Sequence, residues 1–566
     1  MITLLEDLKK DNEAPAFLTE EGFKTLQGTY LLSGETPRGM YTRVSKAAAS
    51  YYADSAHWEK EFFDIIWKNW LCLATPVASN MGATRGLPIS CNAIHVADSV
   101  DGIFTKNHEL AMLSKNGAGV AIYVGDVRGR GASITGNGYS EGVIPWLKVY
   151  DTTTMAVSQG STRRGASAVY LPIDHADIQE FLNIRRPVGD MNRRCLNLNH
   201  GVCISDTWMS TMLAGDKNKR DTWLEVLKAR VETGEPYLFF TDNVNNQNPD
   251  CYKGNNLKVS TSNICTEIDL YTDKDHSFVC CLSSLNLVRY SEWKNTNTVK
   301  TTVRFLDAVL QEYINKTEDT HGLQASRNSA IKGRAIGIGV LGWHTLLQQS
   351  DIAFDSFDAM KLNADIFKHL RTQSDIATKE LAEELGEPEW CKGYGRRNTH
   401  CLAVAPTVSN SAISGGYSAG IEPIAANIYS VKSSKGTFIR KNLILENLLE
   451  MRAQNTDDNW KSINANSGSV QHLECLTEHE KKVFLTAREI NQYALVRQAA
   501  QRQKWIDQGQ SLNLFFPANA DPKYIHGVHI EAWQTGLKSL YYLRTEGVIK
   551  GDVASRSKDE CSACEA

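Results

Sequence analysis

The chain has 566 residues, of which 42% are hydrophobic and 22% are charged, values typical of globular proteins that exclude long disorder and fibrous or repeat architectures. Its 61 Lys and Arg against 65 Asp and Glu give a net charge of -4, which excludes the strongly basic surface of a nucleic-acid-binding protein. Apolar runs are too short for a membrane span, and the start, MITLLEDLKKD, is unlike a signal peptide, so we expect a cytoplasmic protein.

The chain is predicted to have three parts. Residues 1–74 form a helical region, because His57 to Leu73 is amphipathic with Trp58, Phe62 and Ile65 at helical spacing. In residues 75–545, short β-branched runs alternate with helical ones, which predicts one large α/β domain with a largely parallel sheet. Residues 546–566 have few large apolar groups and are expected to form a mobile tail.

The pattern places these elements in order along the chain. The predicted strands are Val120–Val124, Ala166–Leu171, Leu196–Ile204, Asn263–Asp269, Phe278–Val288, Cys401–Val404 and Ser511–Phe515. The predicted helices are Val100–Lys115, Ala176–Ile184, Thr222–Glu232, Thr302–Ile314, Phe357–Leu385, Arg440–Met451, Glu478–Glu489 and Tyr493–Gln508.

Three chemically capable side chains share one predicted strand. Side chains alternate between the faces of a strand, so Asn263, Cys265 and Glu267 would project together, about 7 Å from one to the next. A carboxylate can remove a proton, an amide can bind a hydroxyl, and a thiol can act as nucleophile or radical carrier. The alternative is an ordinary half-buried strand with a polar outer face.

Further cysteines lie in two other apolar segments. Cys280 and Cys281 are adjacent in a predicted strand, so only one of them can face a cavity shared with Cys265. Cys91 lies in the run from Pro88 to Ile94 and, by itself, reads as a buried core residue. A disulfide between distant strands needs Cβ atoms within about 4.5 Å of each other, which a sequence does not show.

Three polar motifs occupy the last third of the chain. The loop from Pro406 to Asn410 follows an apolar run and could hold an anion, although such turns usually only cap a helix. Tyr541 and Tyr542 are adjacent in an apolar run, where the alternative is aromatic core packing. Cys561 and Cys564 form a CxxC pair close to the C-terminus; because a second CxxC for zinc is missing, disulfide exchange is favoured over metal binding.

Together these motifs resemble the catalytic large subunit of class I ribonucleotide reductase. The motifs N-x-C-x-E, C-x-L-S-x-x-N-L, S-C, P-T-V-S-N and L-Y-Y-L-R-T, which include Ser90 and Leu540, are those of that family. The resemblance extends from about Thr75 to Ala566. It implies a ten-stranded α/β barrel with a central finger loop that carries Cys265, so the strand around Cys265 would become a short extended loop segment.

The resemblance also implies a catalytic role for each residue of the triad and its neighbours. Cys265 would be the thiyl radical that abstracts the ribose 3′ hydrogen, Glu267 would take the 3′-hydroxyl proton, and Asn263 would bind the same hydroxyls. Cys91 and Cys280 would deliver two reducing equivalents and end as a disulfide. Cys280 is selected over Cys281 because it is the cysteine two residues before the leucine and three before the serine of the C-x-L-S motif. Ribose and diphosphate would be held by Thr75, Ser90, Gly119, Pro406, Thr407, Val408, Ser409 and Asn410.

Partners and cofactors follow from the same resemblance. Tyr541 and Tyr542 would relay the radical from a separate, metal-containing small subunit, while this chain itself would bind no metal or cofactor. Cys561 and Cys564 would reduce the active-site disulfide and be recharged by thioredoxin or glutaredoxin. We expect a homodimer, and the compact chain suggests a minimal, virus-encoded version.

A site for regulatory nucleotides is implied as well. Deoxynucleoside triphosphates or ATP would act as specificity effectors at Asp98, Ser99, Arg128, Gln159 and Arg163, although Asp98 could equally be a plain N-cap. The position of a second phosphate-binding arginine is taken by Thr135. The short N-terminus does not match an ATP-cone, so we expect no shutdown by dATP through such a domain.

Two other classes of protein share some of these sequence features. The adenosylcobalamin-dependent reductase shares the barrel and cysteines but needs neither the two tyrosines nor a partner subunit. A non-enzymatic nucleotide-binding subunit would have a broken triad, whereas all five cysteines and the carboxylate are present. A zinc-binding interaction protein built on Cys561 and Cys564 has the least support.

Overall fold

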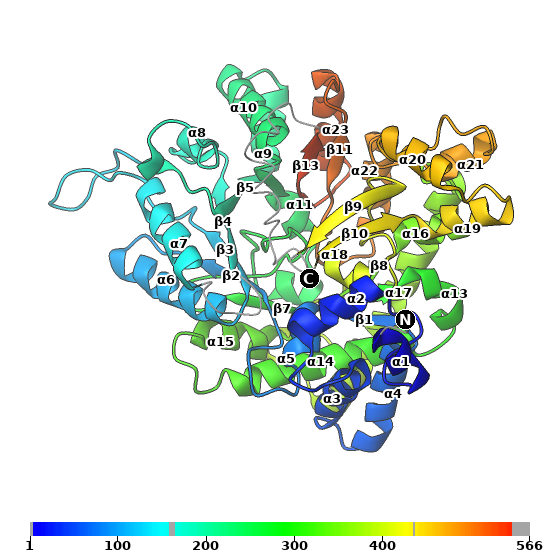
Figure 1. The fold of residues 1–566 in the computed structure, drawn as a ribbon. Coiled ribbons are helices and arrows are strands. Elements are labelled where there is room, and N and C mark those ends of the chain that lie inside the picture. The colour runs from blue at the N-terminus through cyan, green and yellow to red at the C-terminus, as the bar shows by residue number, and fades with distance from the viewer. Residues whose placement is uncertain (1–3, 158–164, 434–435, 546–566) are drawn as a thin grey trace.

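The centre of the molecule is a curled sheet surrounded by helices (Figure 1). The structure, a computed structural model, describes residues 4–157, 165–433 and 436–545. Its largest sheet has nine strands in the order β1-β7-β2-β3-β4-β5-β6-β12, with β8 paired to β7 off this path. These strands are β1 (Leu71–Leu73), β2 (Cys91–His95), β3 (Gly119–Tyr123), β4 (Ala166–Pro172), β5 (Leu198–Ile204), β6 (Tyr237–Phe240), β7 (Phe278–Asn286), β8 (Ile336–Leu341) and β12 (Ser539–Leu540).

Two blocks of opposite direction make up this sheet. β2 to β6 are parallel to one another, whereas β7 and β8 are parallel to each other and antiparallel to β2. The second block continues through single bridges from Ile338 to Leu402 and from Val404 to Gln510. It returns to β6 through β12, because the Tyr541 N–H donates to the Leu512 carbonyl and β12 pairs with β6. Backbone hydrogen bonds therefore close the curled sheet around an interior.

The α/β fold class with a barrel-like sheet is thus confirmed, whereas the count of ten strands stays a prediction. The predicted strand Cys401–Val404 is present only as the single bridges at Leu402 and Val404. Two glycines explain how this segment approaches β8 so closely. A Cβ at Gly337 would lie 2.4 Å from Leu282 and 3.0 Å from Ala403, and one at Gly339 would lie 2.8 Å from the Ala403 carbonyl.

Helices join successive strands and cover the sheet (Figure 1). The helices predicted at Val100–Lys115 and Phe357–Leu385 have those bounds, with Ser99 and Ser356 as their N-caps. The helices of this layer are α5 (Thr75–Asn80), α6 (Val100–Lys115), α7 (Ile144–Val157), α8 (Ile178–Phe181), η2 (Met191–Arg193), α9 (Asp206–Leu213), α10 (Lys217–Thr233), α11 (Thr241–Asn246), α12 (Asp250–Gly254), η3 (Leu287–Arg289), α13 (Tyr290–Trp293), α14 (Thr298–Lys316), α15 (Gln324–Gly333), α16 (Trp343–Gln349), α17 (Phe357–Leu385), η4 (Glu389–Cys391), α18 (Val408–Ile413), α22 (Gln492–Gln503) and α23 (Pro522–Gln534).

The N-terminal part is helical and packs on α14 (Figure 1). Its elements are α1 (Leu4–Lys10), α2 (Glu20–Thr25), the π-helix η1 (Leu26–Tyr30), α3 (Pro37–Ala49) and α4 (Ser55–Trp67). The predicted helix His57–Leu73 is wrong at its end, because Asn69 adopts a left-handed φ of 58° that stops the helix and Leu71–Leu73 becomes β1.

A smaller apolar cluster lies beyond the main core. It contains Leu445, Leu449, Trp460, Ile463 and Phe484, and its elements are β9 (Ile428–Ser433), β10 (Gly436–Lys441), α19 (Leu443–Met451), α20 (Asp457–Ala465) and α21 (Glu478–Val483). The predicted helix Arg440–Met451 is therefore wrong at its start, and the predicted helix Glu478–Glu489 is too long.

The remaining strands are β11 (Leu514–Phe516) and β13 (Leu543–Thr545), which pair in parallel. Among the helices that the structure describes, none has the run of apolar residues that a membrane span requires.

Candidate functional site

The finger loop, residues 261–269, is fully buried, and the predicted strand Asn263–Asp269 is wrong. The chain turns at Ile264 and Cys265, and Thr266 has a left-handed φ of 67°. The Asn263 side chain causes the turn, because its Oδ1 accepts the backbone N–H of Glu267 at 3.0 Å and of Ile268 at 3.1 Å. The alternation of a strand therefore does not set the directions of these side chains.

Backbone carbonyls of the finger loop are bound from several sides of the curled sheet. Tyr170 on β4 donates its hydroxyl to Asn263 O at 2.7 Å. Ser511 donates to Cys265 O at 2.5 Å, and Ser539 on β12 donates to Thr266 O at 2.7 Å. Because these bonds join main-chain atoms, they fix the position of the loop independently of the thiol side chain.

The finger loop carries two buried polar side chains that could act on a substrate, Asn263 and Glu267. The Asn263 amide interacts with the Glu267 carboxyl and lowers its pKa, but among the described residues the buried Asn263 Nδ2 makes no hydrogen bond of ordinary geometry, so a ligand that accepts from it would complete its hydrogen bonding. Glu267 is buried and accepts from Ser511 at 3.1 Å. Burial raises the pKa of Glu267 to about 7, against the lowering effect of its hydrogen bonds. A carboxyl with this pKa can accept a proton near neutral pH.

Cys91 and Cys280 lie directly opposite each other on neighbouring antiparallel strands, β2 and β7. Residues paired in this way have Cα atoms about 4.5–5.5 Å apart and project from the same face. That separation falls within the range of about 4.4–6.8 Å that a disulfide spans. The structure holds both residues as thiols, and their position opposite each other in the ladder is compatible with a disulfide.

Cys280 and Cys281 face opposite sides of β7. Gln508 donates to Cys280 Sγ at 3.5 Å, and the charges of Cys91 and Glu267 act on Cys280. Burial, the largest cause, raises the pKa of Cys280 well above its ordinary value. Burial, Cys91 and Asp307 on α14 likewise raise the pKa of Cys281, so the register of the ladder, in which Cys280 and not Cys281 pairs with Cys91, distinguishes the two residues. Cys280 is therefore the member of the pair that shares the interior with Cys91 and the finger loop.

The predicted substrate residues gather where β1, β2 and α18 meet. Gly119 donates its N–H to Ser90 O at 2.8 Å, beside Cys91. Cys72 on β1 donates to Asn410 O at 3.5 Å, which brings the segment before Thr75 against the loop from Pro406 to Asn410. In that loop Thr407 has a left-handed φ of 54° and accepts from the Gly420 N–H at 2.7 Å. Val408, which is half exposed, begins α18, and Ser409 lies in its first turn.

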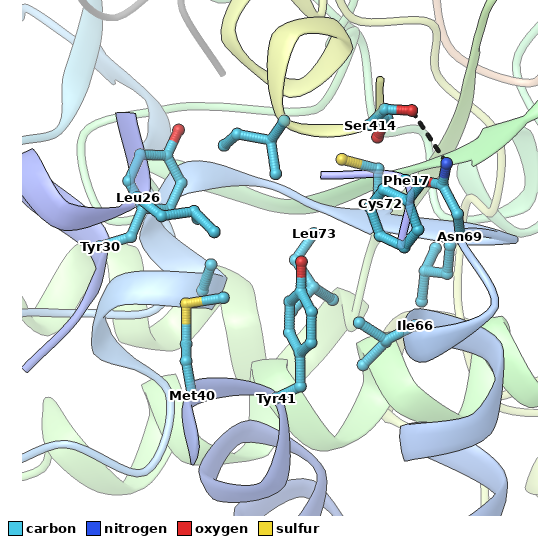
Figure 2. Close-up of a pocket in the computed structure, with 13 residues that line it drawn as sticks. Phe17, Leu26, Tyr30, Met40, Tyr41, Ile66, Asn69, Cys72, Leu73 and Ser414 are labelled. Atoms are coloured by element: carbon cyan, nitrogen blue, oxygen red, sulfur yellow. Dashed lines mark hydrogen bonds between the residues drawn. The ribbon is translucent and has the colours of Figure 1, made fainter. Parts of the chain in front are cut away.

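A small cavity separates the N-terminal helices from this region (Figure 2). Tyr30, Tyr41 and Cys72 line it, and Asn69 donates to Ser414 O at 2.9 Å across one side. With a volume of about 10 Å³ it holds about one water molecule, not a nucleotide. Tyr30, from the π-helix η1, forms a 2.7 Å hydroxyl–hydroxyl hydrogen bond with Thr75.

Tyr541 and Tyr542 belong to a cluster of three tyrosines, of which sequence reasoning missed Tyr237. The rings of Tyr541 and Tyr542 have centroids 4.3 Å apart, and the Tyr237 ring lies 4.8 Å and 5.0 Å from them. Asn199, also missed, donates to the Tyr237 and Tyr542 hydroxyls at 2.5 Å and 2.6 Å. Tyr541 is buried opposite Leu512, next to the Ser511 that binds the Cys265 carbonyl.

The predicted effector residues are only partly described. Ser99, not Asp98, caps α6, and Asp98 accepts from Arg128 Nε at 2.8 Å. Gln159 and Arg163, together with the tail cysteines Cys561 and Cys564, lie outside the described residues. In the described ranges, no group of three His, Cys, Asp or Glu side chains gathers as metal ligands.

Comparisons with known proteins identify the family and the fold of the chain. The family described as "Ribonucleotide reductase, barrel domain" matches residues 89–219, 214–393 and 388–543, and "Ribonucleotide reductase, all-alpha domain" matches residues 16–86. A putative ribonucleoside-diphosphate reductase large subunit of Frog virus 3 (isolate Goorha) is 39% identical over 96% of this chain and 98% of that protein.

A second viral relative and a solved structure are similar over the same length. The ribonucleoside-diphosphate reductase large subunit of Invertebrate iridescent virus 3 is 34% identical over 96% of this chain and 98% of its own. The alpha subunit of the class Id ribonucleotide reductase of Actinobacillus ureae superposes with a TM-score of 0.88 at 41% identity, over 94% of this chain and 98% of that one.

Proposed function

The chain belongs to the ribonucleotide reductase large-subunit family, and on this premise we propose that Cys265, Cys91 and Cys280 carry its reaction. The enzyme is a ribonucleoside-diphosphate reductase, which converts ribonucleotides to 2′-deoxyribonucleotides. The observation that carries the assignment of residues is the cross-strand thiol pair on β2 and β7 beside the buried finger loop.

In the proposed cycle Cys265, oxidised by one electron to a thiyl radical, abstracts the 3′ hydrogen atom of the ribose. Glu267 accepts the 3′-hydroxyl proton, and the Asn263 amide donates to a hydroxyl oxygen of the ribose. Cys91 and Cys280 supply two electrons and two protons as the 2′-hydroxyl leaves as water, and they end as a disulfide. Support comes from the buried Asn263 Nδ2, which makes no hydrogen bond of ordinary geometry in the described part of the chain, and from the raised pKa of Glu267 beside it.

The pH dependence of turnover tests the role of Glu267. Its pKa is raised to about 7, so the carboxylate that accepts the proton is lost as pH falls below that value. We expect kcat to decrease about tenfold per pH unit on the acid side. The control is Asp269→Asn: the Asp269 charge raises the pKa of Glu267, so this variant should shift the acid limb to slightly lower pH. A flat profile between about pH 5.5 and 8 contradicts the role.

We propose that Tyr542 and Tyr541 carry the radical equivalent from a metal-containing small subunit to Cys265. The contacts among the three tyrosine rings and the bond from Ser511 to the Cys265 carbonyl support a continuous route. Tyr541 is buried whereas Tyr542 is partly exposed, so the route runs from the side of Tyr542 inward. The cobalamin-dependent alternative gains nothing from the comparisons, because the solved relative is a class Id alpha subunit.

Replacing Tyr542 by phenylalanine tests this route. The ring contacts with Tyr237 and Tyr541 persist, but the hydroxyl bonded to Asn199 is lost. We expect cytidine diphosphate reduction, measured with the small subunit, to fall at least about 10³-fold. Tyr394→Phe, at a half-exposed site away from the cluster, should keep full activity. Unchanged activity of Tyr542→Phe, or product formed without any small subunit, would overturn the relay.

We propose that ribose and diphosphate bind between the β1–α5 junction and α18. The residues of this site are Thr75, Ser90, Gly119, Pro406, Thr407, Val408, Ser409 and Asn410. Asn410 Oδ1 is buried without a hydrogen-bond partner in the described part of the chain, which supports a ligand there.

Replacing Tyr30 by phenylalanine tests the proposed role of Thr75 in the substrate site. This change removes the 2.7 Å hydrogen bond to Thr75 and leaves the Thr75 hydroxyl less well oriented. A hydrogen bond contributes about 0.5–1.5 kcal/mol, so we expect KM for the nucleotide to rise about 3–10-fold with kcat little changed. Tyr41→Phe, which lines the same cavity from α3, is the matched control (Figure 2). Equal KM values for the two variants would contradict the role of Tyr30.

The remaining assignments are also proposals. Cys561 and Cys564 would reduce the Cys91–Cys280 disulfide and exchange with thioredoxin or glutaredoxin. Nucleoside triphosphate effectors would bind at Asp98, Ser99, Arg128, Gln159 and Arg163. A homodimer is supported by exposed apolar side chains of α6 and α7, Val100, Phe104 and Met155. We further propose the division into residues 1–74, 75–545 and 546–566.

A further inference from the structure

A second pair of cysteines, Cys251 on α12 and Cys391 at the end of η4, lies outside the proposed catalytic machinery. Both are buried thiols. Asn255 Nδ2 donates to Cys251 O at 2.7 Å and to Trp390 O at 3.0 Å, so one amide group holds the two segments together at these residues. The two thiol groups are close enough for each to shift the pKa of the other, and Cys251 Sγ also donates to Thr399 O at 3.9 Å.

Cys251 also lines a cavity of about 660 Å³. The cavity lies between α12, α17 and α22, and its other lining residues include Arg371, Tyr394 and Arg396. Tyr394 is 37% exposed, so the cavity opens to solvent, whereas Cys251 is only 1% exposed. Hydrogen peroxide is small enough to enter this cavity beside Cys251.

The surroundings of Cys251 favour the reactive thiolate. The hydrogen bond from Cys391 lowers the pKa of Cys251, burial opposes this, and the positive charge of Arg396 lowers it further. By contrast, burial raises the pKa of Cys195 to about 12. Cys391 has a raised pKa because of its hydrogen bond to Cys251. One member of the pair can therefore attack while its neighbour keeps a proton.

We propose that Cys251 and Cys391 form an oxidisable dithiol that a small hydroperoxide converts into a disulfide. The Cys251 thiolate attacks one peroxide oxygen and the O–O bond breaks, which gives a sulfenic acid and, after protonation, water. The Cys391 sulfur then attacks the Cys251 sulfur, an S–S bond forms, and the sulfenic oxygen leaves as a second water. Two thiols and one peroxide thus give one disulfide and two waters.

The position of the pair gives this bond a structural consequence. Residues 255–262 lead from α12 into the finger loop, and residues 392–400 lead from η4 to the segment that bridges β8 and Gln510. A disulfide would therefore tie together the two strand connections that enter the interior from this side. The catalytic thiols Cys91 and Cys280 lie on other strands.

Peptide mapping of the full-length chain tests the proposal. The reduced protein is treated with one equivalent of hydrogen peroxide, alkylated, and digested with trypsin without reductant. We expect the peptides 231–253 and 380–392 to be joined with the loss of two hydrogen atoms, and to separate on reduction. Cys251 should also be alkylated at least about tenfold faster than Cys195 before oxidation.

Matched variants distinguish this pair from other thiols. Cys251→Ser and Cys391→Ser should each abolish the joined peptide, whereas Cys401→Ser should retain it. Cys251 found joined to Cys401, or oxidised to sulfinic acid without a joined peptide, would overturn the proposal. So would equal alkylation rates for Cys251 and Cys195. The wild-type map decides the matter if a variant fails to fold, and it does not depend on the reductase assay.

Discussion

Replacing Cys265 by serine is expected to abolish deoxynucleotide formation, with a loss of at least about 10⁴-fold in kcat. An O–H bond is stronger than an S–H bond, so a serine hydroxyl cannot take the place of the thiol as a one-electron carrier. The loop itself should survive, because the bonds to Cys265 O and to Asn263 Oδ1 do not depend on the thiol. The measurement is cytidine diphosphate reduction with the small subunit and a dithiol reductant.

A buried cysteine away from the loop provides the control for this change. Cys203 on β5 is buried and donates to Ser260 O at 3.3 Å, a bond that a serine hydroxyl can also make. Cys203→Ser should therefore keep activity within about threefold of the wild type. Measurable multiple turnover by Cys265→Ser would remove the basis of the radical mechanism.

A second large effect is expected from Cys280→Ser, in contrast to its neighbour Cys281→Ser. Cys280 faces Cys91 across the ladder between β2 and β7, so its loss leaves the reaction without a disulfide to form. We expect multiple turnover to fall at least about 10³-fold. Cys281 projects from the opposite face of β7 to Cys280, and its replacement should affect stability more than chemistry.

Thiol counting complements this assay. After one round of substrate in the absence of external reductant, the wild type should lose the thiols of Cys91 and Cys280 together, and Cys281→Ser should do the same. Equal activity losses for Cys280→Ser and Cys281→Ser would show that the face of β7 from which a cysteine projects does not decide which cysteine reacts.

Local sequence signals predicted the long helices well. Phe357–Leu385 and Val100–Lys115 were placed correctly because serine N-caps and apolar periodicity coincide there. The end of the helix at Trp67 was missed, since an asparagine in the left-handed region looks like any polar residue in a helix. The sequence from Cys401 to Val404 is typical of a strand, but in the structure this segment forms only single β-bridges to its neighbours.

The finger loop shows where sequence reasoning reaches its limit. The choice of Asn263, Cys265 and Glu267 came from their chemistry, but the assumed strand was wrong because Asn263 folds the chain back on itself. The choice of Cys280 over Cys281 agrees with the register opposite Cys91, and its catalytic role remains a proposal. Tyr237 and Asn199 reach Tyr542 only through tertiary packing, so no local pattern identifies them.

The oxygen and the nitrogen of the Asn263 amide have different roles in the structure. Its oxygen is fully engaged with the N–H groups of Glu267 and Ile268, which also fixes which end of the amide is nitrogen. The N–H hydrogens, which also act on the Glu267 carboxyl, are then the part of the amide that can meet a bound molecule. The fold therefore sets the polarity of this contact in advance: the group that lies against Asn263 must present a lone pair, and a group that could only donate would be refused.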